Sequence, residues 1–450
     1  MKVNLLKGSI LKSLLLFATP LLVSRIFQQL YNTVDTMIVG NCLGDTSLAA
    51  IGSCSAIYDL LVGFALGIGN GLAIVTARSY GAGEEDEVKK SVAGSIVIGV
   101  ICSIVVSVIG SFILYPLLKL LNTPAEIIKE AYQYISLIVM SIIVMFAYNL
   151  CAGLLRAIGD SLIPLIFLMF SSLLNIGLDL LFIVRFQWGV TGAALATVLS
   201  EGISAILCLI YIGKKMKLLI PGREHFVMER ELYEEMLGQG FSMGFMSSIV
   251  SMGSVILQYG INGLGYLTIA AHTTARKLYL FFNLPFASLS LATSTFVSQN
   301  RGADQKERIR SAVRIVYICD IILASVITVI LLLFSRNLVQ LISGSKESIV
   351  LDNGSLYLKV VGPFYAVLGV LGSTRYALQG LGEKLLPLIS SIIELAGKIV
   401  FVLLFIPKFG YSAVIVCEPV IWCIMTIQLV YSFYAHPYMK RRLRRKPVVE

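Results

Sequence analysis

Two carboxylates stand inside apolar stretches, where a charge is costly. Asp35 lies in the run Tyr-Asn-Thr-Val-Asp-Thr-Met-Ile-Val-Gly, and Asp179 lies in Leu-Leu-Asn-Ile-Gly-Leu-Asp-Leu-Leu. Asn175 precedes Asp179 by four residues, so both side chains project from one face of a helix. Thr197 stands in a third apolar stretch. Ionisable residues within a membrane span cost about 2.5–3.5 kcal/mol on insertion scales, which makes these positions functional candidates.

Their chemistry is that of cation or proton binding. Carboxylate, amide and hydroxyl oxygens are the ligands that hard cations accept, and two neighbouring carboxylates can share a proton. We therefore predict a coupling site for Na⁺ or H⁺ formed by Asp35, Asn175, Asp179 and Thr197. The alternative is a polar cluster that only holds helices together. Pro20 stands fifteen residues before Asp35 and removes a helix hydrogen bond, which predicts either a static kink or a hinge coupled to the charge of Asp35.

The elements that must position these residues are membrane helices. Of the 450 residues, 57% are apolar and 14% are charged, whereas soluble proteins carry about 25% charged residues. This composition excludes a soluble enzyme and a disordered chain. A helix needs about 20 apolar residues to cross the hydrocarbon core, and about twelve stretches qualify. Approximate spans are 13–40, 47–78, 91–115, 128–157, 161–184, 190–213, 232–260, 266–299, 309–334, 353–380, 385–406 and 411–435.

The basic residues orient these spans. Lys and Arg gather in alternate loops, such as 214–230 and 301–310, and in the tail 440–446. By the positive-inside rule these loops and both termini are cytoplasmic. The net charge of +10 then reflects orientation and anionic lipids rather than a nucleic-acid partner. We expect a multi-pass protein of the bacterial inner (plasma) membrane, with Asp35, Asp179 and Thr197 about 9–13 Å below its outer surface.

The chain repeats itself. Asn41-Cys42-Leu43-Gly44 matches Asn262-Gly263-Leu264-Gly265 at a shift of 221 residues, and Gly159 and Gly189 match Gly382 and Gly410 at nearly the same shift. The predicted fold is all-α, with two parallel six-helix lobes related by a pseudo-twofold axis along the membrane normal. We place the N-terminal lobe at 1–213, a cytoplasmic linker at 214–231, and the C-terminal lobe with its basic cytoplasmic tail at 232–450.

The second lobe does not repeat the acidic site. The repeat sets Ile256 opposite Asp35 and Val402 opposite Asp179, and it supplies Glu394, Lys398 and Glu418 instead. Glu394 and Lys398 have favourable i,i+4 spacing. We predict a neutralised carboxylate–lysine–carboxylate network here, with a purely structural ion pair as the alternative. Residues that could line a central cavity are Met243, Met246, Gln258 and Arg276.

These motifs resemble those of the multidrug and toxic compound extrusion (MATE) transporters. The resemblance rests on Gln-Gln-Leu-Tyr-Asn-Thr-Val-Asp-Thr-Met-Ile-Val-Gly around Asp35, on the following Leu-Gly-x-x-x-Leu-Ala-Ala, and on Tyr80-Gly81-Ala82-Gly83 with its counterpart at 299–303. It implies that Asp35, Asn175, Asp179 and Thr197 form the cation or proton site and that Pro20 bends the first helix. Some members use acidic residues in helices seven and ten, which here offer no carboxylate at mid-span.

The resemblance implies a secondary antiporter that works by alternating access of two lobes. It would export amphipathic, often cationic, organic compounds or drugs in exchange for H⁺ or Na⁺. We expect a monomer in contact with membrane lipids, with no cofactor, no nucleic-acid partner and no enzymatic activity; phosphate-loop, His-Glu-x-x-His and Gly-x-Ser-x-Gly motifs are absent from the sequence. The alternative is a flippase or exporter of a lipid-linked or anionic precursor with a related fold, favoured by Lys398, Arg276 and Arg375.

Overall fold

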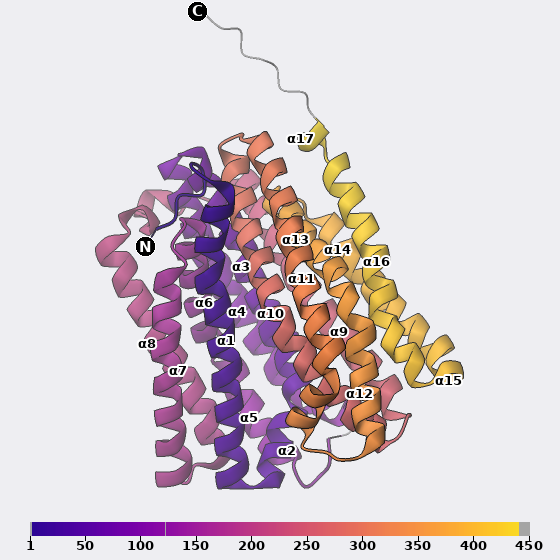
Figure 1. Cartoon of the computed structure of the whole chain (residues 1–450). Helices are drawn as coiled ribbons and strands as arrows, with labels where there is room; N and C mark the ends of the chain where they lie inside the picture. The colour runs from indigo at the N-terminus through magenta and orange to yellow at the C-terminus, as the bar shows by residue number, and fades with distance from the viewer. Residues whose placement is uncertain (1, 122, 441–450) are drawn as a thin grey trace, which may run out of the picture.

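The computed structural model describes residues 2–121 and 123–440, and nearly all of them are helical (Figure 1). Within these ranges eleven helices are long and apolar enough to cross a membrane, or twelve if one bent helix pair counts as a single span. No β-strand occurs among the described residues. The predicted all-α membrane fold with about twelve spans is therefore confirmed.

Six spans build the N-terminal lobe. They are α1 (Ile10–Leu43), α2 with α3 (Asp45–Ser53, Ser55–Ala82), α4 (Glu85–Leu120), α5 with α6 (Ile128–Met140, Ile142–Ala157), α7 (Leu162–Asp179) with the π-helix η1 (Leu180–Arg185), and α8 (Gly189–Lys215). The bent pair is α5 and α6, which meet at 49°. Two short 3₁₀ helices, η2 (Lys217–Leu219) and η3 (Arg223–His225), lie in the predicted linker.

Six more spans build the C-terminal lobe. They are α9 (Arg230–Asn262), α10 (Tyr266–Gly302), α11 (Lys306–Ser343), α12, η4 and α13 (Ser348–Val361, Gly362–Phe364, Tyr365–Gly380), α14 with the π-helix η5 and α15 (Leu385–Val400, Phe401–Phe405, Ile406–Phe409), and α16 (Tyr411–Ala435). The short α17 (Pro437–Lys440) follows. Residues 441–446 of the predicted basic tail lie outside the described residues.

The backbone repeats in the two lobes as the sequence predicts. Gly44 and Gly265 have φ of +86° and +91°, Gly159 and Gly382 have +91° and +89°, and Gly189 and Gly410 have +60° and +55°. Residues with a side chain rarely adopt a positive φ, so glycine is the favoured residue at each of these turns. The π-helices η1 and η5 also occupy matching places in the two lobes. Both copies therefore use the same turns and the same helix distortions.

The lobes are joined at the end where α1 begins, which is the predicted cytoplasmic face. There α3 packs on α9 and α10, and α1 packs on α10 (Figure 1). The end of α10 donates hydrogen bonds across the junction, from Ser298 to the Ile74 carbonyl (2.6 Å), Gln299 to that of Ala157 (2.7 Å), and Asn300 to that of Leu5 (3.2 Å). Toward the other end α1 separates from this contact: of its described side chains beyond Leu21, only Val39 is buried.

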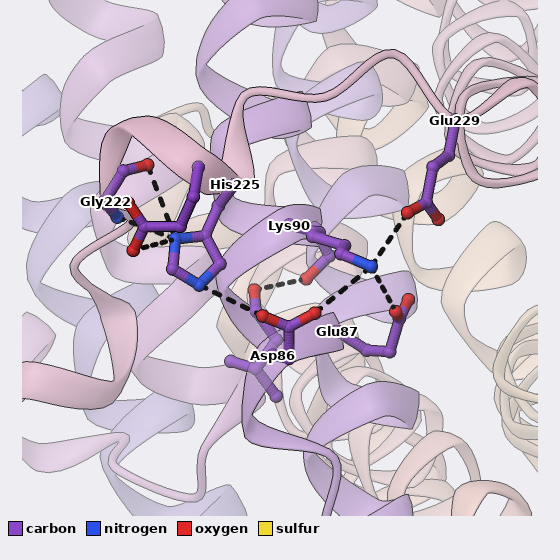
Figure 2. Close-up of polar contacts among 9 residues, drawn as sticks. Asp86, Glu87, Lys90, Gly222, His225 and Glu229 are labelled. Atoms are coloured by element: carbon purple, nitrogen blue, oxygen red, sulfur yellow. Dashed lines mark hydrogen bonds and ion pairs between the residues drawn. The ribbon is translucent and has the colours of Figure 1, made fainter.

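The predicted linker is fastened to the N-terminal lobe by polar contacts (Figure 2). Lys90 on α4 contacts Asp86 (3.1 Å), Glu87 (3.0 Å) and, in the linker just before α9, Glu229 (2.8 Å). His225 in η3 contacts Asp86 at 3.2 Å. One lysine thus contacts two carboxylates of the N-terminal lobe and one of the linker.

Candidate functional site

The structure brings the two intramembrane aspartates of the N-terminal lobe together. Asp35 on α1 and Asp179 at the end of α7 lie within hydrogen-bonding reach of each other. The Asp179 side chain is 0% exposed. Neither oxygen of Asp179, nor Oδ1 of Asp35, accepts a hydrogen bond from any described residue. Two carboxylates so placed repel each other unless a proton or a cation lies between them.

Asn175 is buried beside this pair. Its amide oxygen and nitrogen have no hydrogen-bond partner in the described part of the chain. A buried amide without partners costs free energy, so Asn175 is suited to ligate what the aspartates attract. Asp179 is the last residue of α7 before the helix widens into η1. Such π-type distortions within helices occur frequently at functional sites.

Asp35 and Thr197 line one cavity of about 390 Å³. The Thr197 hydroxyl donates to the Ala193 carbonyl at 3.2 Å, which leaves its oxygen lone pairs available. Asn175 and Asp179 are not among the residues that line this cavity. The four predicted residues are thus split between the cavity wall and a buried layer behind it.

Glu201 also belongs to this site, although the sequence analysis did not predict it. It lines the same cavity on α8, together with Asp59 of α3. Its Oε2 is buried and has no partner among the described residues. The signal was present, because Glu201 follows Thr197 by four residues and therefore shares its helix face. Three carboxylates, those of Asp35, Asp59 and Glu201, therefore line this cavity.

Pro20 lies inside α1, which continues as one helix from Ile10 to Leu43. The Ser24 hydroxyl donates to the Pro20 carbonyl at 2.8 Å. This hydrogen bond links the Pro20 carbonyl to a side chain one helical turn further along α1. The structure places Pro20 close to where α1 parts from α10, and the hinge stays a prediction.

The C-terminal lobe places the predicted Glu394, Lys398 and Glu418 in one buried network. Lys398 Nζ lies 2.9 Å from Glu394 Oε1 and 3.7 Å from Glu418 Oε1. Arg276 holds both Glu418 oxygens, at 2.8 and 2.7 Å. Tyr357 also donates to Glu418, at 3.1 Å. Each of these two carboxylates is therefore paired with a cation, unlike Asp35 and Asp179.

The four predicted cavity residues are placed apart. Met243 lines a small cavity of about 20 Å³ with Asn70 and Arg156. Met246 is buried, and its sulfur receives a hydrogen bond from Gln379 at 3.4 Å. Gln258 donates to Asn262 on its own helix at 2.8 Å. Arg276 belongs to the ion network.

Two lobes of six spans, joined at one face and carrying carboxylates without partners among the described residues of one lobe, are typical of a polytopic membrane transporter. The MatE family model matches residues 20–181 and again residues 243–404, and the chain belongs to the MATE family of multidrug efflux transporters. The two matches begin 223 residues apart, in agreement with the sequence repeat.

Known relatives agree with this assignment. The chain is 27% identical over 449 residues to "Probable multidrug resistance protein YoeA" of Bacillus subtilis, covering 98% of this chain and 96% of the relative. It is 23% identical over 397 residues to "Multidrug export protein MepA" of Staphylococcus saprophyticus, covering 86% of each. A solved "outward-facing conformation of a multidrug resistance MATE family transporter" superposes with a TM-score of 0.90 at 21% identity, over 98% of this chain and 99% of that one.

Proposed function

We propose that this transporter is a secondary antiporter that exports amphipathic, often cationic, organic compounds in exchange for H⁺ or Na⁺. The observation that carries this proposal is the Asp35–Asp179 pair, because the described residues that line the cavity beside it include no lysine or arginine. Neutralisation by an incoming H⁺ or Na⁺ removes the repulsion between the two carboxylates. A cationic substrate competes for the same negative charge, which couples export to ion entry.

The lobes supply the conformational change. In this structure the lobes are joined at the predicted cytoplasmic face, so the N-terminal cavity serves release toward the outside. Parting this junction and closing the opposite one would present the site to the cytoplasm, as alternating access requires. We propose that the protein works as a monomer in the bacterial plasma membrane with both termini cytoplasmic, and that it needs neither a cofactor nor a nucleic-acid partner.

The precursor-flippase alternative receives less support. The C-terminal cations that favoured it, Lys398 and Arg276, are occupied by Glu394 and Glu418. Arg375 lies 3.9 Å from Glu394. Lys398 and Arg276 are therefore not free to bind an anion.

Efflux of a fluorescent cation from proteoliposomes, under separate Na⁺ and pH gradients, tests the antiport. We expect one gradient to drive efflux in the wild type, and Asp35→Asn and Asp179→Asn each to reduce that driven rate about tenfold or more, because a removed carboxylate no longer binds the ion. Asp352→Asn is the matched control, since Asp352 is exposed and pairs with Arg336 near the predicted outer surface. Unchanged gradient dependence in both site variants would falsify the coupling role.

A further inference from the structure

A second cavity adjoins the first within the N-terminal lobe. It measures about 230 Å³ and lies between α1, α3, α6 and α7, with Leu291 of α10 at its edge. Four residues line both cavities, namely Gln28, Leu66, Tyr148 and Asn149. The two cavities are therefore neighbouring parts of one polar space. Together they fall within the roughly 300–1,000 Å³ that small-molecule sites occupy.

Two arginines line the second cavity, Arg25 from α1 and Arg156 from α6. Arg25 makes no hydrogen bond or ion pair with the residues that the structure describes. Arg156 Nη2 has a single weak hydrogen bond, to Asn70 Oδ1 at 3.4 Å. Both arginines line the same cavity, and no Asp or Glu is among the described residues that line it.

The cations of the C-terminal lobe show that this arrangement is unusual within the molecule. Arg276 and Lys398 each contact a carboxylate directly. Arg25 lies well inside α1, and Arg156 lies in the last turn of α6. A cation held within a span without a carboxylate is costly, and this cost falls when an oxyanion binds. Arginine presents a planar fork of N–H donors that matches the two oxygens of a carboxylate.

The polar space therefore has two ends of opposite charge. Asp35, Asp59 and Glu201 line the first cavity, whereas Arg25 and Arg156 line the second. Four tyrosines border the acidic end, at positions 31, 58, 134 and 148. Aromatic faces attract organic cations and pack on flat apolar rings.

We propose that Arg25 and Arg156 form a carboxylate-binding subsite that selects zwitterionic amphiphiles. The carboxylate of such a molecule binds the arginine pair, and its ammonium or delocalised cation faces the acidic end. This inference rests on the proposed function for the transport of such compounds. It adds that compounds with both charges bind more tightly than compounds with the cation alone.

Equilibrium binding to the purified full-length transporter tests the subsite, measured by fluorescence anisotropy. The probes are tetramethylrhodamine, which carries a carboxylate, and its methyl ester, which has the same rings and cation without the carboxylate charge. We expect the wild type to bind the free acid about tenfold more tightly, because hydrogen bonds to a charged group are worth this much or more. Arg25→Gln and Arg156→Gln should each remove most of that preference and change ester binding by less than about twofold.

The controls separate charge from folding. Arg336→Gln removes an exposed arginine far along the sequence in the other lobe and should leave the preference intact. Arg25→Lys keeps the charge and should retain part of the preference, so it tests the subsite even if Arg25→Gln folds poorly. Equal binding of the two dyes by the wild type, or an equal loss of both in the arginine variants, would overturn the proposal.

A third probe, the anion carboxyfluorescein, defines the substrate class. If the arginine variants weaken carboxyfluorescein binding but leave that of tetramethylrhodamine unchanged, the subsite takes anions alone and the zwitterion proposal is wrong. Failure of the antiport itself gives a different result. In that case no ion gradient moves either rhodamine, while the preference for the free acid in the binding assay still depends on Arg25 and Arg156.

Discussion

At the scale of single residues, Lys398 shows how the C-terminal lobe tolerates charge. Its side chain is 1% exposed and lies between Glu394 and Glu418. A buried ion pair is weak evidence for net stability, but removal of one partner leaves an uncompensated charge. The lysine therefore compensates the charges of its two neighbours.

We predict that Lys398→Ala destabilises the protein by about 3–5 kcal/mol, because Glu394 is then left with only a distant Arg375. Thermal unfolding in detergent, followed by the loss of the monodisperse peak in gel filtration, measures this effect. The double variant Glu394→Leu, Lys398→Met removes both charges and should recover most of the stability. Wild-type stability and transport in Lys398→Ala would show that the network has neither a structural nor a functional role.

At the scale of elements, the linker depends on charges that lie outside the membrane. The hydrogen bond from Lys90 holds the pKa of Asp86 below its usual range. The hydrogen bond to Glu229, followed by those to Glu87 and Asp86, raises the pKa of Lys90. Because the pKa of Asp86 is lower in the folded protein, its contribution to stability is present above its unfolded value and is lost as pH falls through the folded value.

We therefore predict a pH-dependent effect of Lys90→Gln. The variant should unfold a few degrees below the wild type at pH 7, since three carboxylates then repel one another around position 90. This difference should narrow between about pH 5 and pH 3 as the carboxylates become protonated. Parallel melting curves at pH 7, 5 and 3.5 measure it. Lys214→Gln, at the exposed end of α8, is the control, and a difference that grows in acid would contradict the assignment.

At the scale of the whole molecule, close backbone contact joins the two lobes. A Cβ on Gly71 of α3 would lie 2.5 Å from the Gln239 carbonyl oxygen and 2.7 Å from the Gly240 Cα. A Cβ on Gly67 would lie 2.7 Å from the Gly244 Cα. Backbone atoms cannot yield as a flexible side chain can, so glycine at these positions permits the lobes to meet.

We predict that Gly71→Ala weakens the joined arrangement of the lobes by about 1–3 kcal/mol, a typical cost of overpacking. Hydrogen–deuterium exchange should rise at the ends of α3 and α10 on the predicted cytoplasmic face. The matched control is Gly213→Ala on α8, where an added Cβ has no neighbour within 4 Å; it should be neutral or slightly stabilising. Equal exchange in the two variants would mean that contact at Gly71 does not limit how the lobes join.

The sequence by itself determined the spans, the repeat and the family, because hydrophobic length, glycine turns and charge bias are properties of the chain. It also predicted that Glu394 and Lys398 pair, since a spacing of four residues places them on one helix face. Only the tertiary structure decided which distant groups meet. Arg276 reaches Glu418 across 142 residues, Glu201 joins the cavity of Asp35, and Arg25 and Arg156 line one cavity that has no carboxylate among its described lining residues. Helix rotation and the packing between helices fix such contacts, and neither can be read from spacing along one helix.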